Sequence, residues 1–144
     1  MSTHPFVGTW RLVSFEIRTA NGEVSYPFGE DAAGYLIYSQ DGYMAASIME
    51  ANRARFASAD FRASSPEEKR AAFDTYITYC GTYEVKDDKV THHAEISLFP
   101  NWSGTDQERF FEISGDQLTL RTPPTKFEGD EITGHLIWQR TASR

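Results

Sequence analysis

The fold class is decided by the stretch Gly8-Thr9-Trp10-Arg11-Leu12-Val13-Ser14-Phe15-Glu16-Ile17-Arg18. It is rich in β-branched and aromatic residues, which is typical of a strand that lies half-buried in a sheet. The following Asn21-Gly22 step suits the positive φ angles of a tight turn, and residues 23–26 are predicted to return as a short strand. The chain therefore begins as β-structure.

The rest of the chain continues as short strands separated by turns. Asp41-Gly42 and Gly115-Asp116 are the turn pairs of two predicted hairpins. Strands are predicted over 34–39, 42–49, 78–85, 90–99, 107–114, 117–122 and 132–140. The pattern predicts an all-β fold, an antiparallel barrel or sandwich of about eight strands. A closed barrel is favoured because it leaves no exposed edges and encloses a lumen.

One short helix is expected among these strands. Ser65-Pro66-Glu67-Glu68 has the order of a helix start, with Ser65 as N-cap and Glu68 completing a capping box. Apolar residues then recur at helical spacing, at Phe73, Tyr76, Ile77 and Cys80. Residues 50–65 before the helix are predicted to form a loop. Loop and helix together are a candidate lid over the barrel opening, with simple packing on the surface as the alternative.

Length and composition predict one globular domain over residues 1–144. A chain of 144 residues, 40% apolar and 24% charged, is long enough to bury a single core. Aromatic residues make up 14% of the chain, and large rings suit both pleated sheets and the walls of ligand cavities. The composition therefore favours a barrel with a usable interior.

Charge and targeting signals limit the partners. The net charge of −7 disfavours nucleic acid as a partner, because a phosphate backbone would be repelled. No run of 18 apolar residues suggests a membrane span, and we see no secretory signal. With Cys80 as the single cysteine, a cytoplasmic protein without disulfides is expected. A homodimer is left open.

Several short motifs together resemble a known family. Gly8-x-Trp10 on the first strand and Arg140 at the end of the last resemble the calycin signature, in which an arginine covers the tryptophan ring. Further matches are Gly42-Tyr43-Met44, Tyr79-Cys80-Gly81-Thr82-Tyr83, Thr91-His92-His93-Ala94-Glu95, Pro100-Asn101-Trp102-x-Gly104 and Gln107-x-Arg109. The series is similar to the bacterial and fungal lipocalin-like domain family over nearly the whole chain. This resemblance implies a calycin-type barrel and little about activity.

His92 is the residue of greatest chemical interest. Alternation along residues 90–98 places His92 on a mostly apolar face with Val90, Ala94, Ile96 and Leu98, whereas His93 and Glu95 point to solvent. An inward histidine would be neutral. Three roles stay open: a structural histidine satisfied by a neighbouring tyrosine or carbonyl, a ligand contact, or a general acid and base.

Other candidates for the lumen wall are Tyr43, Tyr83, Trp102 and Arg109. Arg109 shares a face with Phe111 and Ile113, so it is expected to point inward, either toward an oxygen of the ligand or into an ion pair with an acid. Tyrosines suit a pocket for a partly polar ligand, and Gly81 is expected to leave space between Tyr79 and Tyr83.

No metal site or cofactor is expected. His93 and Glu95 share a strand face, but a catalytic zinc site needs three protein ligands and the sequence indicates no third. Phosphate-loop and dinucleotide-binding motifs are also absent from the sequence.

The sequence therefore predicts that a small, largely apolar molecule binds in the lumen. The predicted lining residues are Tyr43, Tyr83, His92, Trp102 and Arg109. A cofactor-free isomerase, cyclase or lyase, with His92 moving a proton and Arg109 or a tyrosine stabilising an oxyanion, is the alternative. A third possibility is a barrel filled with aromatic rings, which would have no cavity.

Overall fold

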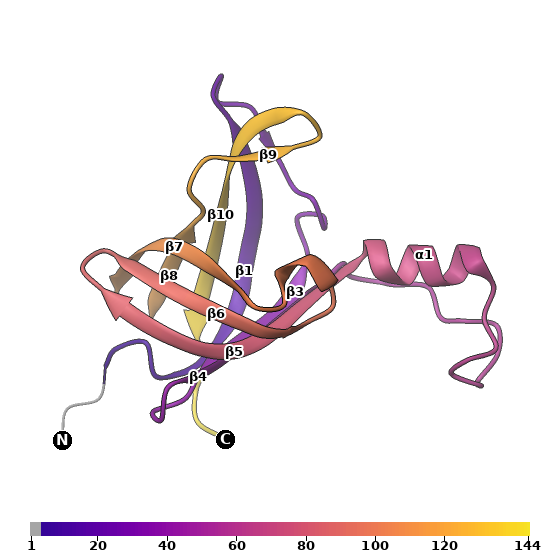
Figure 1. Ribbon diagram of the computed structural model, residues 1–144, viewed down its shortest axis with the longest axis horizontal. Coiled ribbons are helices and arrows are strands. Elements are labelled where there is room, and N and C mark those ends of the chain that lie inside the picture. The colour runs from indigo at the N-terminus through magenta and orange to yellow at the C-terminus, as the bar shows by residue number, and fades with distance from the viewer. Residues whose placement is uncertain (1–3) are drawn as a thin grey trace.

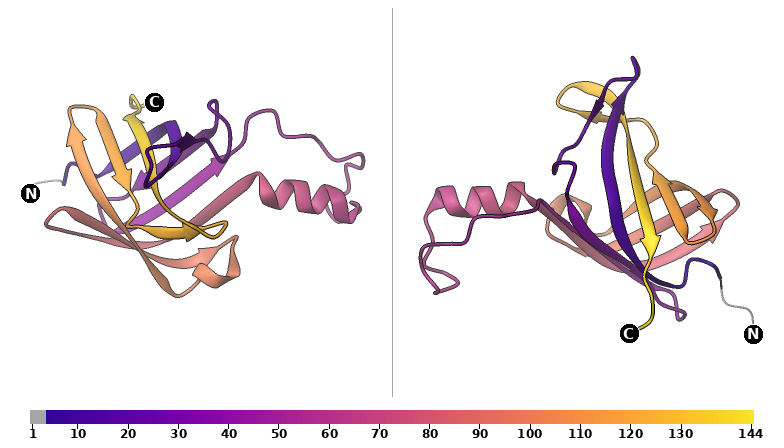
Figure 2. Two further views of the ribbon diagram at one scale, coloured as in Figure 1. Left: turned by 90° about the horizontal axis from the view of Figure 1, so that it is seen from above. Right: turned by 180° about the vertical axis from the view of Figure 1, so that it is seen from behind.

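Eight strands close into an antiparallel barrel in the computed structural model, which describes residues 4–144 (Figures 1 and 2). The described residues form ten strands in all: β1 (Gly8–Thr19), β2 (Val24–Ser25), β3 (Ala33–Tyr38), β4 (Tyr43–Met49), β5 (Tyr76–Lys86), β6 (Lys89–Ser97), β7 (Thr105–Ser114), β8 (Gln117–Arg121), β9 (Thr125–Phe127) and β10 (Asp130–Arg140). The barrel runs β1-β3-β4-β5-β6-β7-β8-β10, and β10 pairs back with β1. The predicted antiparallel barrel with one short helix is confirmed.

Two short strands extend the barrel beyond the eight. β2 pairs with the end of β1, and β9 pairs with the start of β10. The sequence predicted a short returning strand near β2. It did not predict β9, because Pro123-Pro124 just before it suggested only a break in the chain. Both strands lie at the Ile17 end of β1, away from Trp10.

The opposite end of the barrel is plugged by side chains. Phe6 and Trp10 are fully buried there, and the Trp10 indole nitrogen donates a hydrogen bond to the Phe6 carbonyl at 3.0 Å. The Arg140 guanidinium lies 4.2 Å from the centre of the Trp10 ring and donates to the Val7 carbonyl at 2.9 Å. The predicted contact between arginine and tryptophan is confirmed, and it ties the first strand to the last.

An irregularity between β5 and β6 changes which residues face inward. Cys80 pairs with Ile96 and Gly81 with Ala94, so Glu95 is an extra residue in β6. Ile96 is consequently 71% exposed, and its predicted place on the inner face is wrong. The expectation that Gly81 leaves free space is also wrong. A Cβ atom there would overlap the His93 carbonyl oxygen, so backbone fills the position.

Helix α1 (Pro66–Asp74) begins as the sequence predicts. Ser65 accepts a hydrogen bond from the Glu68 backbone, and the Glu68 side chain accepts one from Ser65, which completes the capping box. The predicted helical stripe is wrong beyond Phe73, because the helix ends at Asp74 and the other three residues belong to β5. No residue of α1 is buried, and Figures 1 and 2 show it projecting from the barrel.

None of the helices in the part of the chain that the structure describes has the length and apolar character needed to cross a membrane.

Candidate functional site

The barrel holds a cavity of about 920 Å³ that is open to solvent. Its size lies within the range of small-molecule sites in proteins. Its apolar wall comprises Phe15, Ile17, Phe28, Leu36, Ile48, Ile77, Leu120, Leu136 and Trp138. The cavity excludes the possibility of a barrel filled entirely by its own side chains.

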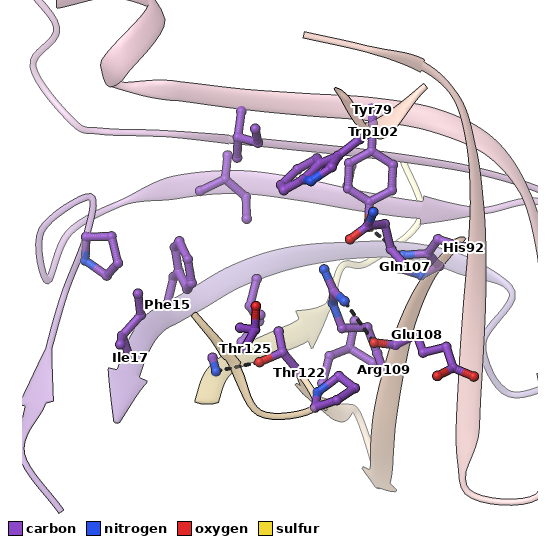
Figure 3. Close-up of a pocket in the computed structure, with 18 of the residues that line it drawn as sticks. Phe15, Ile17, Tyr79, His92, Trp102, Gln107, Glu108, Arg109, Thr122 and Thr125 are labelled. Atoms are coloured by element: carbon purple, nitrogen blue, oxygen red, sulfur yellow. Dashed lines mark hydrogen bonds between the residues drawn. The ribbon is translucent and has the colours of Figure 1, made fainter. Parts of the chain in front are cut away.

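A cluster of polar and aromatic side chains lies on one side of the cavity. Figure 3 shows Tyr79, His92, Trp102, Gln107 and Arg109 close together, with Phe15 and Ile17 on the far side. The cavity thus combines a largely apolar volume with this polar region, which is how proteins bind and orient small molecules.

His92 lies at the centre of this polar region. It faces inward from β6, as predicted, and is 2% exposed. Its Nε2 atom lies 2.6 Å from the Tyr38 hydroxyl, which comes from β3, and its Nδ1 atom lies 2.6 Å from the Tyr79 hydroxyl, which comes from β5. Both ring nitrogens are therefore engaged by tyrosines, the arrangement expected of a structural histidine.

Burial keeps this group of three side chains neutral. Loss of solvent, with smaller effects of Arg109 and His93, lowers the pKa of His92 to about 3. Loss of solvent also raises the pKa of Tyr38 and of Tyr79. At neutral pH the imidazole therefore carries a single proton, and both phenols keep theirs.

Arg109 brings positive charge to the same region. It lies half-buried on β7, lines the cavity as predicted, and donates from Nη1 to the Glu108 carbonyl at 2.8 Å. The side chain of Gln107 also lines the cavity and donates to the Thr105 hydroxyl. These residues place hydrogen-bond donors beside the apolar volume.

Trp102 forms part of the same wall. It lies in the 3-10 turn η1 (Pro100–Trp102), and its ring meets that of Tyr79 edge to face, with centroids 5.9 Å apart. The structure therefore brings three of the predicted lining residues, His92, Trp102 and Arg109, to one cavity.

Tyr43 and Tyr83 do not line the cavity, and their predicted place on its wall is wrong. Met44 and Ile48 are buried on β4, so alternation turns Tyr43 outward, where it is 56% exposed. The Tyr83 hydroxyl donates to the Ser39 carbonyl at 2.9 Å, on the plugged side of the barrel.

Tyr38, Tyr79 and Gln107 take part in the site but are not among the predicted lining residues. A usable signal existed for Tyr38, because it shares a strand face with Leu36, which is buried and lines the cavity. Helix α1 contributes only its last residue, Asp74, to the lining, so the helix does not cover the cavity in this structure.

A metal centre is not indicated in residues 4–144, where no three His, Cys, Asp or Glu side chains are placed to hold an ion. His93 points outward and contacts Asp106 at 2.6 Å and Glu84 at 3.4 Å. The hydrogen bond to Asp106, with smaller contributions from Glu84, raises the pKa of His93.

Comparison with known proteins agrees with this architecture. A family model described as a lipocalin-like domain matches residues 7–141. The chain is also 33% identical over 106 residues to a 4'-hydroxy-3'-methoxypropiophenone carrier protein of Aspergillus oryzae, a match that covers 67% of this chain and 96% of that protein. No solved structure matches significantly. The chain belongs to the lipocalin-like domain family.

Proposed function

We propose that this protein binds a small, largely apolar molecule in the barrel cavity and carries it without chemical change. The observation that supports the proposal most directly is the cavity of about 920 Å³, with its apolar wall and its polar region at Tyr79, Gln107 and Arg109. Burial of the apolar part of the ligand would contribute roughly 25 cal/mol per Å² of covered surface. The polar region would orient it.

The relative from Aspergillus oryzae supports a specific class of ligand. That relative is named as a carrier of 4'-hydroxy-3'-methoxypropiophenone, an aromatic ketone that bears a hydroxyl and a methoxy group. A molecule of this kind has a flat apolar body and a few oxygen atoms, which matches the composition of the cavity described above. We therefore take small aromatic ketones as the first ligands to test.

Carriage is favoured over proton-transfer catalysis by the state of His92. A general base at neutral pH needs a pKa near that pH and a free nitrogen that reaches the substrate. The pKa of His92 is lowered to about 3, and tyrosine hydroxyls occupy both of its nitrogens. His92 therefore fits a positioning role within the wall.

A paired set of variants tests where the ligand binds. Ala46 lines the cavity, whereas its neighbour Ala45 is exposed on the outside of the barrel. Ala46→Leu should weaken binding of the aromatic ketone at least about tenfold, because the added carbons occupy ligand volume. Ala45→Leu should leave binding unchanged.

The measurement is a titration followed by tryptophan fluorescence, because Trp102 and Trp138 both line the cavity. Native mass spectrometry of freshly purified protein complements it by detecting a natural ligand that co-purifies. Equal affinity in both leucine variants, or a failure of any small apolar molecule to bind, would contradict the proposal.

The cytoplasmic location and a homodimer stay predictions that need their own measurements. Cell fractionation would test the first, and light scattering of the purified protein the second.

A further inference from the structure

The hydrogen bonds around His92 have a direction that the positions of the protons decide. A neutral imidazole has one nitrogen that donates and one that accepts. Each tyrosine hydroxyl has one hydrogen to donate and also accepts. Of the two hydroxyls bonded to His92, one therefore donates to the ring and the other accepts from it. The accepting hydroxyl keeps its own hydrogen free for another partner.

The surroundings of the two tyrosines decide which one keeps its hydrogen free. Tyr38 is 1% exposed, does not line the cavity, and within residues 4–144 its hydroxyl has no hydrogen-bond partner other than His92. Were Tyr38 the acceptor, its own hydrogen would be buried without a partner, which is unfavourable. Tyr38 is therefore the donor, and it donates to Nε2 of His92.

The direction of the second hydrogen bond at His92 follows from the direction of the first. With Nε2 accepting, the imidazole proton lies on Nδ1 and is donated to the Tyr79 hydroxyl. Tyr79 lines the cavity, so its remaining hydrogen can be donated into the cavity. A chain of donors thus runs from Tyr38 through His92 to Tyr79, and each bond polarises the next.

We propose that this Tyr38–His92–Tyr79 relay makes the cavity specific for ligands that present a hydrogen-bond-accepting oxygen, such as the carbonyl of an aromatic ketone, to the Tyr79 hydroxyl. The inference deepens the proposed function and rests on it for the presence of a ligand. It adds which atom of the ligand is recognised and which buried residue sets that preference from outside the cavity.

Two further groups support an oxygen acceptor. Arg109 lines the cavity, so its guanidinium group brings positive charge to the region where the oxygen would lie. One of its nitrogens, Nη1, donates to the Glu108 carbonyl. Trp138 also lines the cavity, and in the part of the chain that the structure describes its buried indole N–H has no acceptor. An oxygen-bearing ligand suits both groups.

Two probes of nearly the same shape test the preference. Propiophenone carries a carbonyl oxygen, and propylbenzene lacks it. Tyr79→Phe should weaken propiophenone binding about tenfold and leave propylbenzene binding within about twofold. Tyr38→Phe should also weaken propiophenone selectively, although Tyr38 does not touch the cavity, because Tyr79 would then be free to donate to His92 instead of the ligand.

Tyr83→Phe is the matched control. Tyr83 packs against Tyr38 with ring centroids 4.7 Å apart, but its hydroxyl bonds to Ser39 and takes no part in the relay. This variant should leave the affinities for both probes unchanged. Equal losses for both probes in Tyr79→Phe, or a loss in Tyr83→Phe as large as in Tyr38→Phe, would overturn the relay.

A measurement without ligand tests the relay independently of the proposed function. Nitrogen NMR of the unliganded wild-type protein distinguishes the two imidazole tautomers, and we expect the proton of His92 on Nδ1. A proton on Nε2 would overturn the relay even if both probes bind. Failure of both probes to bind, with the proton on Nδ1, would instead contradict the proposed function for aromatic ketones while the relay stands.

Discussion

Among single residues, His92 links the stability of the barrel to pH. Its ring is almost fully buried between two tyrosine hydroxyls, and its pKa is lowered to about 3 from the usual 6.5 of histidine. The folded protein therefore resists protonation at this site. The unfolded chain exposes the same imidazole to water and takes up a proton with its ordinary pKa.

This difference predicts that acid destabilises the protein through His92. As pH falls below the unfolded pKa of 6.5 and toward the folded pKa of about 3, the unfolded state binds a proton that the folded state does not. From about pH 7 to about pH 5, the free energy of unfolding should fall by roughly 2 kcal/mol more in wild type than in His92→Gln. Urea denaturation at the two pH values measures it.

His93, the neighbour on the outer face, provides a control because its effect on the pH dependence of stability has the opposite sign. Its pKa is raised, so its contribution to stability is present at low pH and is lost as pH rises through the folded pKa. His93→Gln should therefore make the acid-induced loss of stability larger. If His92→Gln loses as much stability on acidification as the wild type does, the assigned role of His92 is wrong.

The alternation of inward and outward side chains along each strand predicted part of the site. It placed His92 and Arg109 on the inner face, because their strands are regular up to those positions. It failed for Ile96, which follows the extra residue in β6, since nothing in the local sequence marks the irregularity. Tyr43 could have been assigned to the outer face from its strand neighbours Met44 and Ile48.

Helix α1 depends on its own sequence more than on the barrel. Its capping box is complete, yet none of its residues is buried. The capping motif was readable from sequence because it is local. The end of the helix was not, since the apolar spacing from Phe73 to Cys80 continues across the junction with β5 and carries the same residues into a strand.

Removal of the cap should therefore loosen the helix without weakening the barrel. Ser65→Ala removes the acceptor for the Glu68 backbone N–H at 3.1 Å and should destabilise the helix by about 1 kcal/mol. Hydrogen exchange in peptides covering residues 66–74 should become faster. Peptides from β1 and β10 serve as the internal control and should exchange as in wild type. A matching increase in the barrel peptides would show that the helix supports the barrel.

Closure of the barrel depends on contact between the two ends of the chain. β1 pairs with β10 along most of its length, and Arg140 covers Trp10 while bonding to the Val7 carbonyl. The closed barrel was predictable because turn residues and the first and last strands carry strong patterns. Whether the interior was hollow was not predictable, because it depends on how all the inward side chains pack together.

Arg140→Gln should destabilise the whole protein. The variant loses the contact with the Trp10 ring and a charged hydrogen bond to the backbone, and we expect a loss of about 2 kcal/mol. Arg11→Gln is the matched control, because Arg11 lies 4.8 Å from the Tyr35 ring centre on the exposed face and should cost less than about 0.5 kcal/mol. Thermal denaturation compares the two. Similar losses in both variants would contradict the special role of Arg140.

Because Phe6, Trp10 and Arg140 plug one end of the barrel, the cavity opens to solvent away from that end. A ligand of the kind proposed above would therefore enter and leave the cavity through one opening. Uptake and release of that ligand would then exclude one another in time. A partner that takes the ligand directly would have to approach the unplugged end of the barrel.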